Sequence, residues 1–281
     1  MLGIIGGTGL YHLEGLSDLE EHPLTTPFGN PSAPVLKGTL HGVPVFFLPR
    51  HGRHHDVLPS EINFRANIWA LKSLGVTQVV SFSACGSLKE ELTPGRLVVA
   101  NQYVDFTKGR REASFFGQGL LAHISSAEPT CPHLTRDLVA AAERIGIELP
   151  TGKTYVCVEG PRLGTKAESF MFRQLGFDVV GMTNVPESFL AREAQMAYVT
   201  VGVITDYDCW KEDPNEQVSM ELVLKRYGES IEVVRNLIRS LVATPLTPPP
   251  AMCREALKGA LFTPEANWTP EQRRMIEVLL H

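Results

Sequence analysis

Two aspartates that follow a predicted strand are the side chains best placed for chemistry. The apolar run 197–204 is typical of a buried strand, and Asp206 and Asp208 stand two positions apart just after it. Side chains alternate along a strand, so both carboxyl groups are expected to point the same way while the extended geometry lasts, and poor solvation there raises their pKa. Such a pair can accept a hydrogen bond from an exocyclic amine and protonate a ring nitrogen, which suits an amino-substituted purine. The alternative is structural, with Asp206 capping a helix or pairing with Lys211.

Four other predicted strands are followed by residues that suit an anion. Backbone N–H groups in a glycine-rich turn, hydroxyl groups and an arginine fork all bind phosphate oxygens. Because ligands in open α/β sheets bind at the carboxyl ends of strands, these positions are expected to meet at one site. They are Gly6-Gly7-Thr8-Gly9, Arg50 with His51, Ser83 with Ala84, and Met182 with Thr183.

Each of these signals also has a plainer interpretation. The glycine turn could be an ordinary tight turn, and it matches neither a Walker loop nor a Rossmann fingerprint. His51, His54, His55 and Asp56 could be taken for a metal cluster, but Gly52 and the surrounding polarity argue against a helix that would align them, so no metal is expected. Cys85 could be a nucleophile, although its apolar setting favours a buried structural thiol.

The elements that must position these residues alternate between short apolar strands and amphipathic helices. This order predicts one α/β domain with a central mixed, mostly parallel sheet flanked by helices on both faces. Residues 35–40 and 44–48 are expected to form a hairpin. The predicted strands are Gly3–Ile5, Val35–Leu40, Pro44–Leu48, Gln78–Ser83, Arg96–Ala100, Thr154–Val158, Asp178–Met182 and Tyr198–Thr205, and the predicted helices are Pro59–Leu74, Leu134–Ile145, Thr165–Leu175, Pro186–Gln195 and Ser219–Val242.

Composition divides the chain into residues 1–243, predicted to be the catalytic domain, and a tail of residues 244–281. The tail begins with a stiff proline-rich spacer and continues with two helix candidates, 251–261 and 270–280. The chain has 281 residues and a formal net charge of −5 with no basic run, so nucleic acid is not an expected partner. Five scattered cysteines, no signal-peptide pattern and no stretch of about 20 apolar residues predict a cytoplasmic protein without a membrane span.

The motifs taken together resemble those of the trimeric purine nucleoside phosphorylase superfamily. They are GIIGGTGL, RHGRHH, NFRANIWALK, SACGSL, EGPR, AESFMFR, GMTNVPE and TDYDCWKE, which run from about residue 2 to residue 242. They are most similar to the S-methyl-5′-thioadenosine phosphorylase branch. That resemblance implies a cofactor-free homotrimer with sites near the subunit interfaces. Its reaction would be attack of phosphate on 5′-methylthioadenosine, which releases adenine and 5-methylthioribose-1-phosphate.

The resemblance also implies roles for individual residues. Asp206 and Asp208, with Tyr207 between them, would bind and protonate the adenine beside Leu163 and Gly164, and Met182 would lie along the ribose. His123 would approach the 5′ side from a neighbouring protomer, while Met220 and Val223 would line the methylthio pocket. The implied phosphate site is Thr8, Arg50, His51, Ser83, Ala84 and Thr183.

The chain departs from the family pattern in the base-binding loop and beside the phosphate residues. The methylthioadenosine branch commonly has Phe-Ser where this chain has Leu163-Gly164, and 6-oxopurine phosphorylases place Glu at the second position. Gly181 and Asn184 stand where animal relatives usually have Asn and Thr. Two alternatives stay open: a purine nucleoside or methylthioinosine phosphorylase, and a catalytically silent nucleoside-binding protein of the same fold.

Overall fold

The computed structural model describes residues 1–7, 10, 14–213, 216 and 218–281. Its strands are β1 (Leu2–Gly6), β2 (Leu16–His22), β3 (Val35–Leu40), β4 (Val43–Pro49), β5 (Gln78–Ser87), β6 (Leu97–Phe106), β7 (Lys153–Val158), β8 (Val179–Gly181) and β9 (Ala197–Asp206). Its helices are α1 (Phe64–Ser73), α2 (Pro132–Arg144), α3 (Lys166–Gln174), α4 (Asn184–Glu193), α5 (Met220–Val242), α6 (Ala251–Arg254), the short 3₁₀ helix Glu265–Asn267 and α7 (Pro270–Leu280). Among the described residues, no helix is both long enough and apolar enough to cross a membrane.

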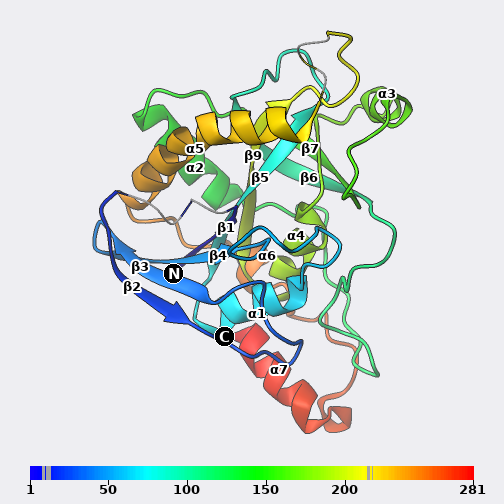
Figure 1. Ribbon diagram of the computed structural model, residues 1–281. Coiled ribbons are helices and arrows are strands. Elements are labelled where there is room, and N and C mark those ends of the chain that lie inside the picture. Colours follow the sequence, from blue (N-terminus) through cyan, green and yellow to red (C-terminus); the bar gives the residue numbers. More distant parts are fainter. Residues whose placement is uncertain (8–9, 11–13, 214–215, 217) are drawn as a thin grey trace.

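The strands form one mixed sheet in the order β2-β3-β4-β1-β5-β8-β7-β6-β9 (Figure 1). The expected hairpin is confirmed, because β3 and β4 pair antiparallel. β2 was not predicted: its sequence, LSDLEEH, is mostly exposed and charged, as suits an edge strand that pairs only with β3 among the described strands.

The expected open sheet is wrong in one respect, because part of the sheet closes into a barrel-like ring. β5 also pairs with β9, so β5, β8, β7, β6 and β9 form a closed circuit. Local sequence patterns predict strands but not closure, since closure depends on how twist and register bring distant strands together.

β5 branches along one of its edges. Residues 78–81 of β5 pair with β1, whereas residues 86–87 pair with β8. The other edge pairs with β9 from Gln78 to Gly86. Residues 82–85 of β5 therefore lie where β1 and β8 diverge, and strand divergence at a carboxyl end creates a place for a ligand.

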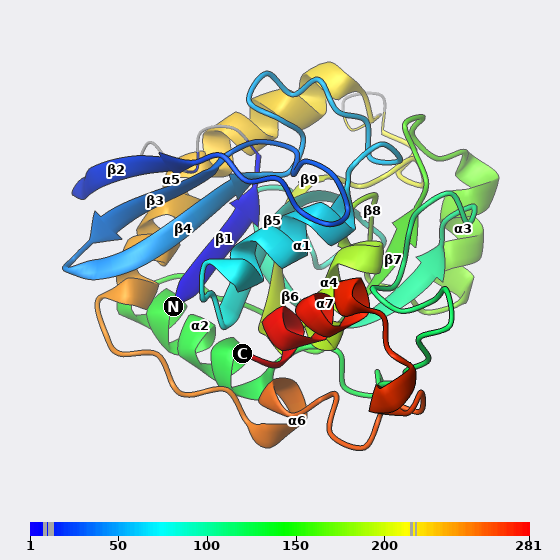
Figure 2. The ribbon, with the colours of Figure 1, turned by 90° about the horizontal axis from the view of Figure 1, so that it is seen from below.

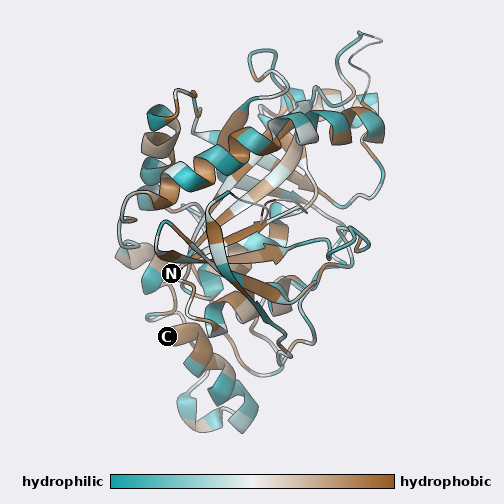
Figure 3. Ribbon diagram, turned by 60° about the vertical axis from the view of Figure 1, so that its left-hand side comes forward, coloured by the Kyte–Doolittle hydropathy of each residue, from teal (hydrophilic) through white to brown (hydrophobic). Residues whose placement is uncertain are grey.

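Helices cover both faces of the sheet, and the core is divided accordingly. Along β1, Ile5 packs in the cluster with α1, α4 and α7, while Leu2 and Ile4 pack in the cluster with α2 and α5. Hydrophobic residues lie along the central strands, whereas α5 alternates between hydrophobic and hydrophilic residues (Figure 3).

The tail packs against the rest of the chain. Asp137 of α2 accepts hydrogen bonds from the Thr247 amide and hydroxyl, and a ring nitrogen of His133 donates to the Pro248 carbonyl at 2.8 Å. At the end of the tail, α7 lies beside α1 (Figure 2). The first tail helix is shorter than expected, because α6 ends at Arg254 and turns follow it.

The helix α4 ends with a buried carboxylate that anchors a loop. Glu193 accepts hydrogen bonds from the Ser114 hydroxyl at 2.8 Å and from the Phe115 amide at 2.7 Å. Burial raises the pKa of Glu193 to about 7, although both hydrogen bonds and the charge of Arg65 act in the opposite direction. Ionising the Glu193 carboxyl group therefore destabilises the folded protein.

Replacing Glu193 should change how stability depends on pH. The folded-state pKa of about 7 lies above the ordinary value of 4.5, so its stabilising contribution is complete below pH 4.5 and is lost as the pH rises through 7. Relative to Glu193→Gln, the wild-type free energy of unfolding should fall by roughly 2 kcal/mol between about pH 5 and pH 8. Chemical denaturation at both pH values measures this difference. Parallel pH profiles for the two proteins would contradict the expectation.

Candidate active site

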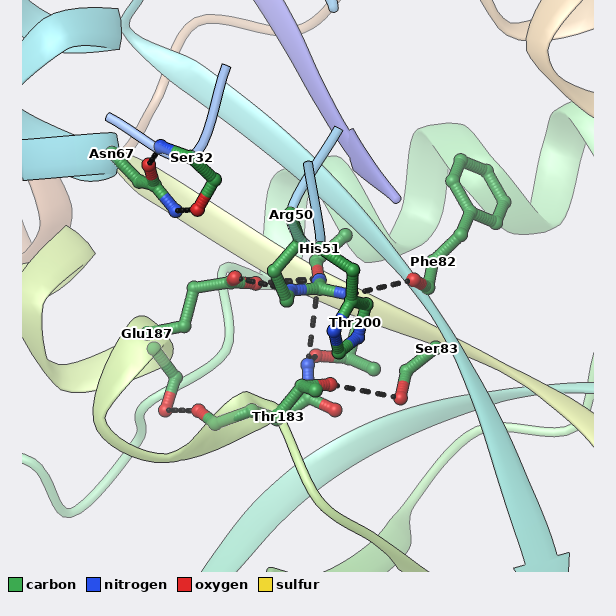
Figure 4. A network of polar contacts seen from close by, with 12 residues as sticks. Ser32, Arg50, His51, Asn67, Phe82, Ser83, Thr183, Glu187 and Thr200 are labelled. Carbon is green, nitrogen blue, oxygen red and sulfur yellow. Dashed lines mark hydrogen bonds and ion pairs between the residues drawn. The ribbon is translucent and has the colours of Figure 1, made fainter. Parts of the chain in front are cut away.

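A buried ion pair lies at the centre of the predicted anion site. Arg50 follows β4, and its Nε donates to Glu187 Oε2 at 2.6 Å while Nη2 donates to Oε1 at 2.9 Å (Figure 4). The Glu187 side chain is completely buried, and that of Arg50 is 2% exposed. The fork geometry fixes the guanidinium plane, and one N–H of Nη1 is left to point toward a ligand.

The other contacts of this pair come from β5 and β9. Arg50 Nη1 donates to the Phe82 carbonyl at 3.2 Å, within the β5 segment that lies between β1 and β8. Ser81 and Tyr198 donate their hydroxyl protons to Glu187 Oε1 at 2.6 and 2.7 Å. Ser81 also accepts a hydrogen bond from Arg50. The carboxylate is therefore well satisfied, as a buried charge requires.

Arg50 and His51, the first two residues of the RHGRHH motif, have opposite protonation behaviour. Burial alone would lower the pKa of Arg50, but Glu187 raises it above its ordinary value. Burial, together with the charge of Arg50, lowers the pKa of His51 to about 4, so the ring is neutral near pH 7. His51 Nδ1 lies 2.9 Å from the Val57 carbonyl and must carry the ring proton there, which leaves Nε2 as an acceptor.

Two hydroxyl groups predicted to bind phosphate lie together beside Arg50. Ser83 Oγ is 3.2 Å from Thr183 Oγ1 (Figure 4). It is also 3.2 Å from the Tyr155 hydroxyl. Ser83 is in the unpaired part of the β5 edge, and Thr183 precedes the first residue of α4. Both side chains are buried, so little protein rearrangement is needed to present them to a ligand.

Tyr155 explains why residue 181 is a glycine. A Cβ atom built on Gly181 would lie only 1.8 Å from the Tyr155 hydroxyl oxygen and 2.5 Å from its Cζ. The tyrosine thus occupies the volume that a side chain at 181 would need, and from there its hydroxyl reaches Ser83. Asn184, the other departure, donates to Tyr198 at 2.9 Å and to Thr200 at 2.7 Å.

The remaining phosphate-site predictions have mixed outcomes. Ala84 lies next to Ser83 in β5, and its carbonyl accepts a hydrogen bond from the Ser83 hydroxyl at 3.2 Å. Thr8 lies outside the described residues. Met182, predicted to lie along the ribose, is near Gly160, where an added Cβ would be 2.5 Å from the Met182 sulfur.

The two aspartates are brought together by a turn rather than by strand alternation. β9 ends at Asp206, and Asp208 has a φ of 51°, in the left-handed region. The Asp208 amide donates to Asp206 Oδ1 at 2.7 Å, and Thr205 donates its hydroxyl proton to Oδ2 at 2.8 Å. Both aspartates border Gly86 of β5, where an added Cβ would lie 2.8 Å from Asp206 Oδ1 and 3.2 Å from Asp208 Cβ.

The predicted rise in the pKa values of both aspartates is confirmed. Burial is the main cause for each, and hydrogen bonds to the carboxylates oppose it. The alternative pairing of Asp206 with Lys211 is wrong, because Lys211 Nζ lies 3.6 Å from Glu90 instead. Arg226 donates to the Thr205 carbonyl at 3.2 Å, which places a positive charge near Asp206.

The base-binding loop lies beside Asp208. An added Cβ at Gly164 would be 3.5 Å from Asp208 Oδ1, and the Gly164 carbonyl accepts from the Cys209 thiol at 3.3 Å. The neighbouring Leu163 is half-buried. The Ser169 hydroxyl is buried near Asp208 without a hydrogen bond of good geometry.

The other four predicted substrate residues make no hydrogen bond to this cluster within the described part of the chain. Exposed His123 packs its ring on Phe262 at 5.5 Å, and its amide donates to the Ala260 carbonyl. Tyr207 packs on Trp210, with ring centroids 5.5 Å apart. Met220 and Val223 lie in the first turn of α5.

A nucleophilic role for Cys85 and a metal cluster receive no support from the described residues. Cys85 is buried with a raised pKa, as expected for a structural thiol. No group of three or more His, Cys, Asp or Glu side chains there is arranged to hold a metal ion.

Sequence reasoning missed the residues that support the anion site. Glu187, Tyr155 and Tyr198 carry no local signature of a binding role, although Glu187 ends the GMTNVPE motif. The position of the Glu187 carboxylate, at the end of a motif shared with a phosphate-binding family, is the one signal that could have identified this residue.

Comparison with known proteins gives the family of the chain. The model of the phosphorylase superfamily matches residues 1–243. The chain belongs to that superfamily. The resemblance inferred from the motifs is therefore confirmed.

The relatives of this phosphorylase are similar over almost their whole length. It is 42% identical to S-methyl-5′-thioadenosine phosphorylase of Geobacter sulfurreducens, covering 100% of this chain and 98% of the relative. It is 46% identical to the protein of the same name in Thermosynechococcus vestitus, with 99% and 97% covered.

Solved structures of phosphorylases are similar as well. A methylthioadenosine phosphorylase from an Antarctic soil metagenomic library superimposes with a TM-score of 0.93 at 40% identity, covering 100% of this chain and 98% of that one. Methylthioadenosine phosphorylase of Schistosoma mansoni in complex with adenine gives a TM-score of 0.80 at 38% identity, with 86% and 90% covered.

Removing one partner of the buried ion pair should destabilise this phosphorylase strongly. Glu187→Ala leaves the Arg50 charge buried without its counter-ion, and such changes cost about 3–5 kcal/mol. Glu148→Ala is the matched control, because Glu148 pairs with Arg96 on the surface and such pairs contribute ~0–1 kcal/mol. Denaturant unfolding of both variants measures the difference, and equal losses would contradict the central role of the pair.

Proposed function

We propose that this protein is an S-methyl-5′-thioadenosine phosphorylase. In this reaction an oxygen of inorganic phosphate forms a bond to C1′ of 5′-methylthioadenosine. The C1′–N9 bond breaks, its electron pair goes to the purine, and adenine and 5-methylthioribose-1-phosphate are released. The names of the full-length relatives support this reaction for the chain.

The observation that carries the proposal is that β5 contributes a residue to the anion end of the site and another to the base end. Ser83, beside Arg50 and Thr183, belongs to the anion end, and Gly86, which borders both aspartates, belongs to the base end. Three residues of a strand span about 10 Å. This separation leaves room for a ribose between a phosphate and a purine.

At the phosphate end, Arg50 would supply a fixed positive charge, and Ser83 and Thr183 would donate hydroxyl hydrogen bonds. The neutral His51 would accept a hydrogen bond from the protonated oxygen of hydrogen phosphate through Nε2. The Ala84 and Thr8 backbones complete the proposed phosphate site. Phosphate so held is both the nucleophile and the counter-charge to the cationic sugar of the transition state.

At the base end, Asp206 and Asp208 would bind the adenine edge. Burial raises the pKa of both carboxyl groups, which makes it easier for one of them to hold a proton. Proton donation toward N7 stabilises the negative charge that grows on the leaving purine. Gly164 offers no carboxylate to a 6-oxopurine N1–H, which favours adenine over the 6-oxopurine alternative.

The remaining parts of the proposal concern the 5′ pocket and the assembly. Met220 and Val223 would contact the methylthio group, and Met182 the ribose.

We propose a homotrimer in which the exposed His123 reaches a neighbouring site; a monomer in light scattering would overturn this. No cofactor is part of the proposal, and five free cysteines favour the cytoplasm, which cell fractionation would test.

The decisive assay measures free base released from 5′-methylthioadenosine with and without phosphate. Adenine release that requires phosphate and exceeds the rates with methylthioinosine and inosine is expected. Faster 6-oxopurine turnover would keep the phosphorylase chemistry but overturn the adenine assignment. Phosphate-independent nucleoside binding without turnover would instead support the silent-binder alternative.

Asp206→Asn should lower kcat for 5′-methylthioadenosine by about 10²–10⁴-fold, because the variant cannot donate the proton that the leaving base needs. The matched control is Asp137→Asn, which makes the same chemical change on α2, outside the proposed site. It weakens only the contact of Asp137 with Thr247 in the tail. Steady-state kinetics at saturating phosphate measures both. An Asp206→Asn enzyme as fast as the control would exclude the proposed role of Asp206.

A further inference from the structure

One face of α5 carries the two residues proposed for the methylthio pocket and, further along the helix, a residue beside the glycine turn. Met220, Val223 and Tyr227 are spaced by three and four residues, so they lie on the same side of the helix. Seven residues of helix span about 10 Å. A side chain at 227 is therefore one to two turns beyond the positions proposed to contact the methylthio group.

The Tyr227 hydroxyl lies at the glycine turn that follows β1. A Cβ added to Gly7 would be 3.4 Å from this oxygen and 3.7 Å from Cε1 and Cζ of the ring. Gly7 belongs to the turn whose backbone was predicted to bind an anion, and the preceding residue, Gly6, accepts a hydrogen bond from the Arg50 amide at 3.1 Å. The tyrosine thus reaches the edge of the anion site from the helix side.

This hydroxyl is buried and has no hydrogen-bond partner among the described residues. Leaving a buried hydroxyl unpaired is unfavourable, and native proteins rarely do so without a reason such as a missing ligand. Burial raises the pKa of Tyr227, while the charge of Arg50 and the nearby Gly7 N–H, which does not meet hydrogen-bond geometry, act in the opposite direction. The hydroxyl therefore stays protonated at neutral pH and is a donor.

We propose that the Tyr227 hydroxyl donates a hydrogen bond to bound phosphate, so that α5 supplies a phosphate-contacting residue in addition to the strand-end residues. The identity of the anion rests on the proposed function, whereas the unpaired donor at the glycine turn does not. Since the same helix face carries Met220 and Val223, α5 would contact both substrates.

The test is Tyr227→Phe, which removes only the hydroxyl. KM for phosphate should rise about 5- to 20-fold, with kcat and KM for 5′-methylthioadenosine nearly unchanged at saturating phosphate. Inorganic phosphate alone, without nucleoside, should also raise the melting temperature of Tyr227→Phe less than that of the wild type. Tyr103→Phe is the control, because its hydroxyl bonds Thr200 at 2.9 Å. That variant should lose stability but keep the wild-type KM for phosphate.

The outcomes separate this proposal from the proposed function. If Tyr227→Phe keeps the wild-type KM and the wild-type thermal response to phosphate, the hydroxyl is only an unpaired structural group and the proposal is overturned. If the wild type shows no phosphorolysis of any nucleoside, the proposed function fails. A weakened thermal response to phosphate in the variant would still support the anion contact in that case.

Discussion

The ion pair between Arg50 and Glu187 is the interaction on which the rest of the site depends. A guanidinium group in the interior is tolerated only when a carboxylate and further hydrogen bonds replace the water it has lost. Here Glu187 comes from α4, and the supporting hydroxyls come from β5 and β9. The pair thus fixes a helix against two strands and leaves a positive charge facing the place where β1 and β8 separate.

The base end of the site uses the opposite electrostatic arrangement. Two carboxyl groups are buried next to each other, and a backbone N–H and a threonine hydroxyl satisfy only part of their hydrogen-bonding capacity. A positively charged group thus lies at one end of the site and two carboxyl groups with raised pKa at the other. A reaction that brings an anion to the sugar and protonates the leaving base needs this separation.

The sequence was sufficient for most elements but not for their closure. Apolar runs predicted β4, β5 and β9. The residues that follow the predicted strands correctly indicated that Arg50, Ser83 and Thr183 would lie close together. The pattern could not reveal the ring of strands, since the pairing of β5 with β9 and β8 depends on long-range register. It also missed β2, whose exposed charged residues carry no apolar alternation. Glu187 and Tyr155 were missed because their roles exist only after distant segments have met.

The contact between Tyr155 and Gly181 determines which residue can stand at position 181. A chain that keeps the tyrosine must keep glycine at 181, since even a methyl group there would overlap the ring. A chain that gains a side chain at 181 must first give up the aromatic ring at 155, together with its hydrogen bond to Ser83. Position 181 therefore cannot change while the tyrosine remains, so an exchange between the two arrangements must begin at position 155.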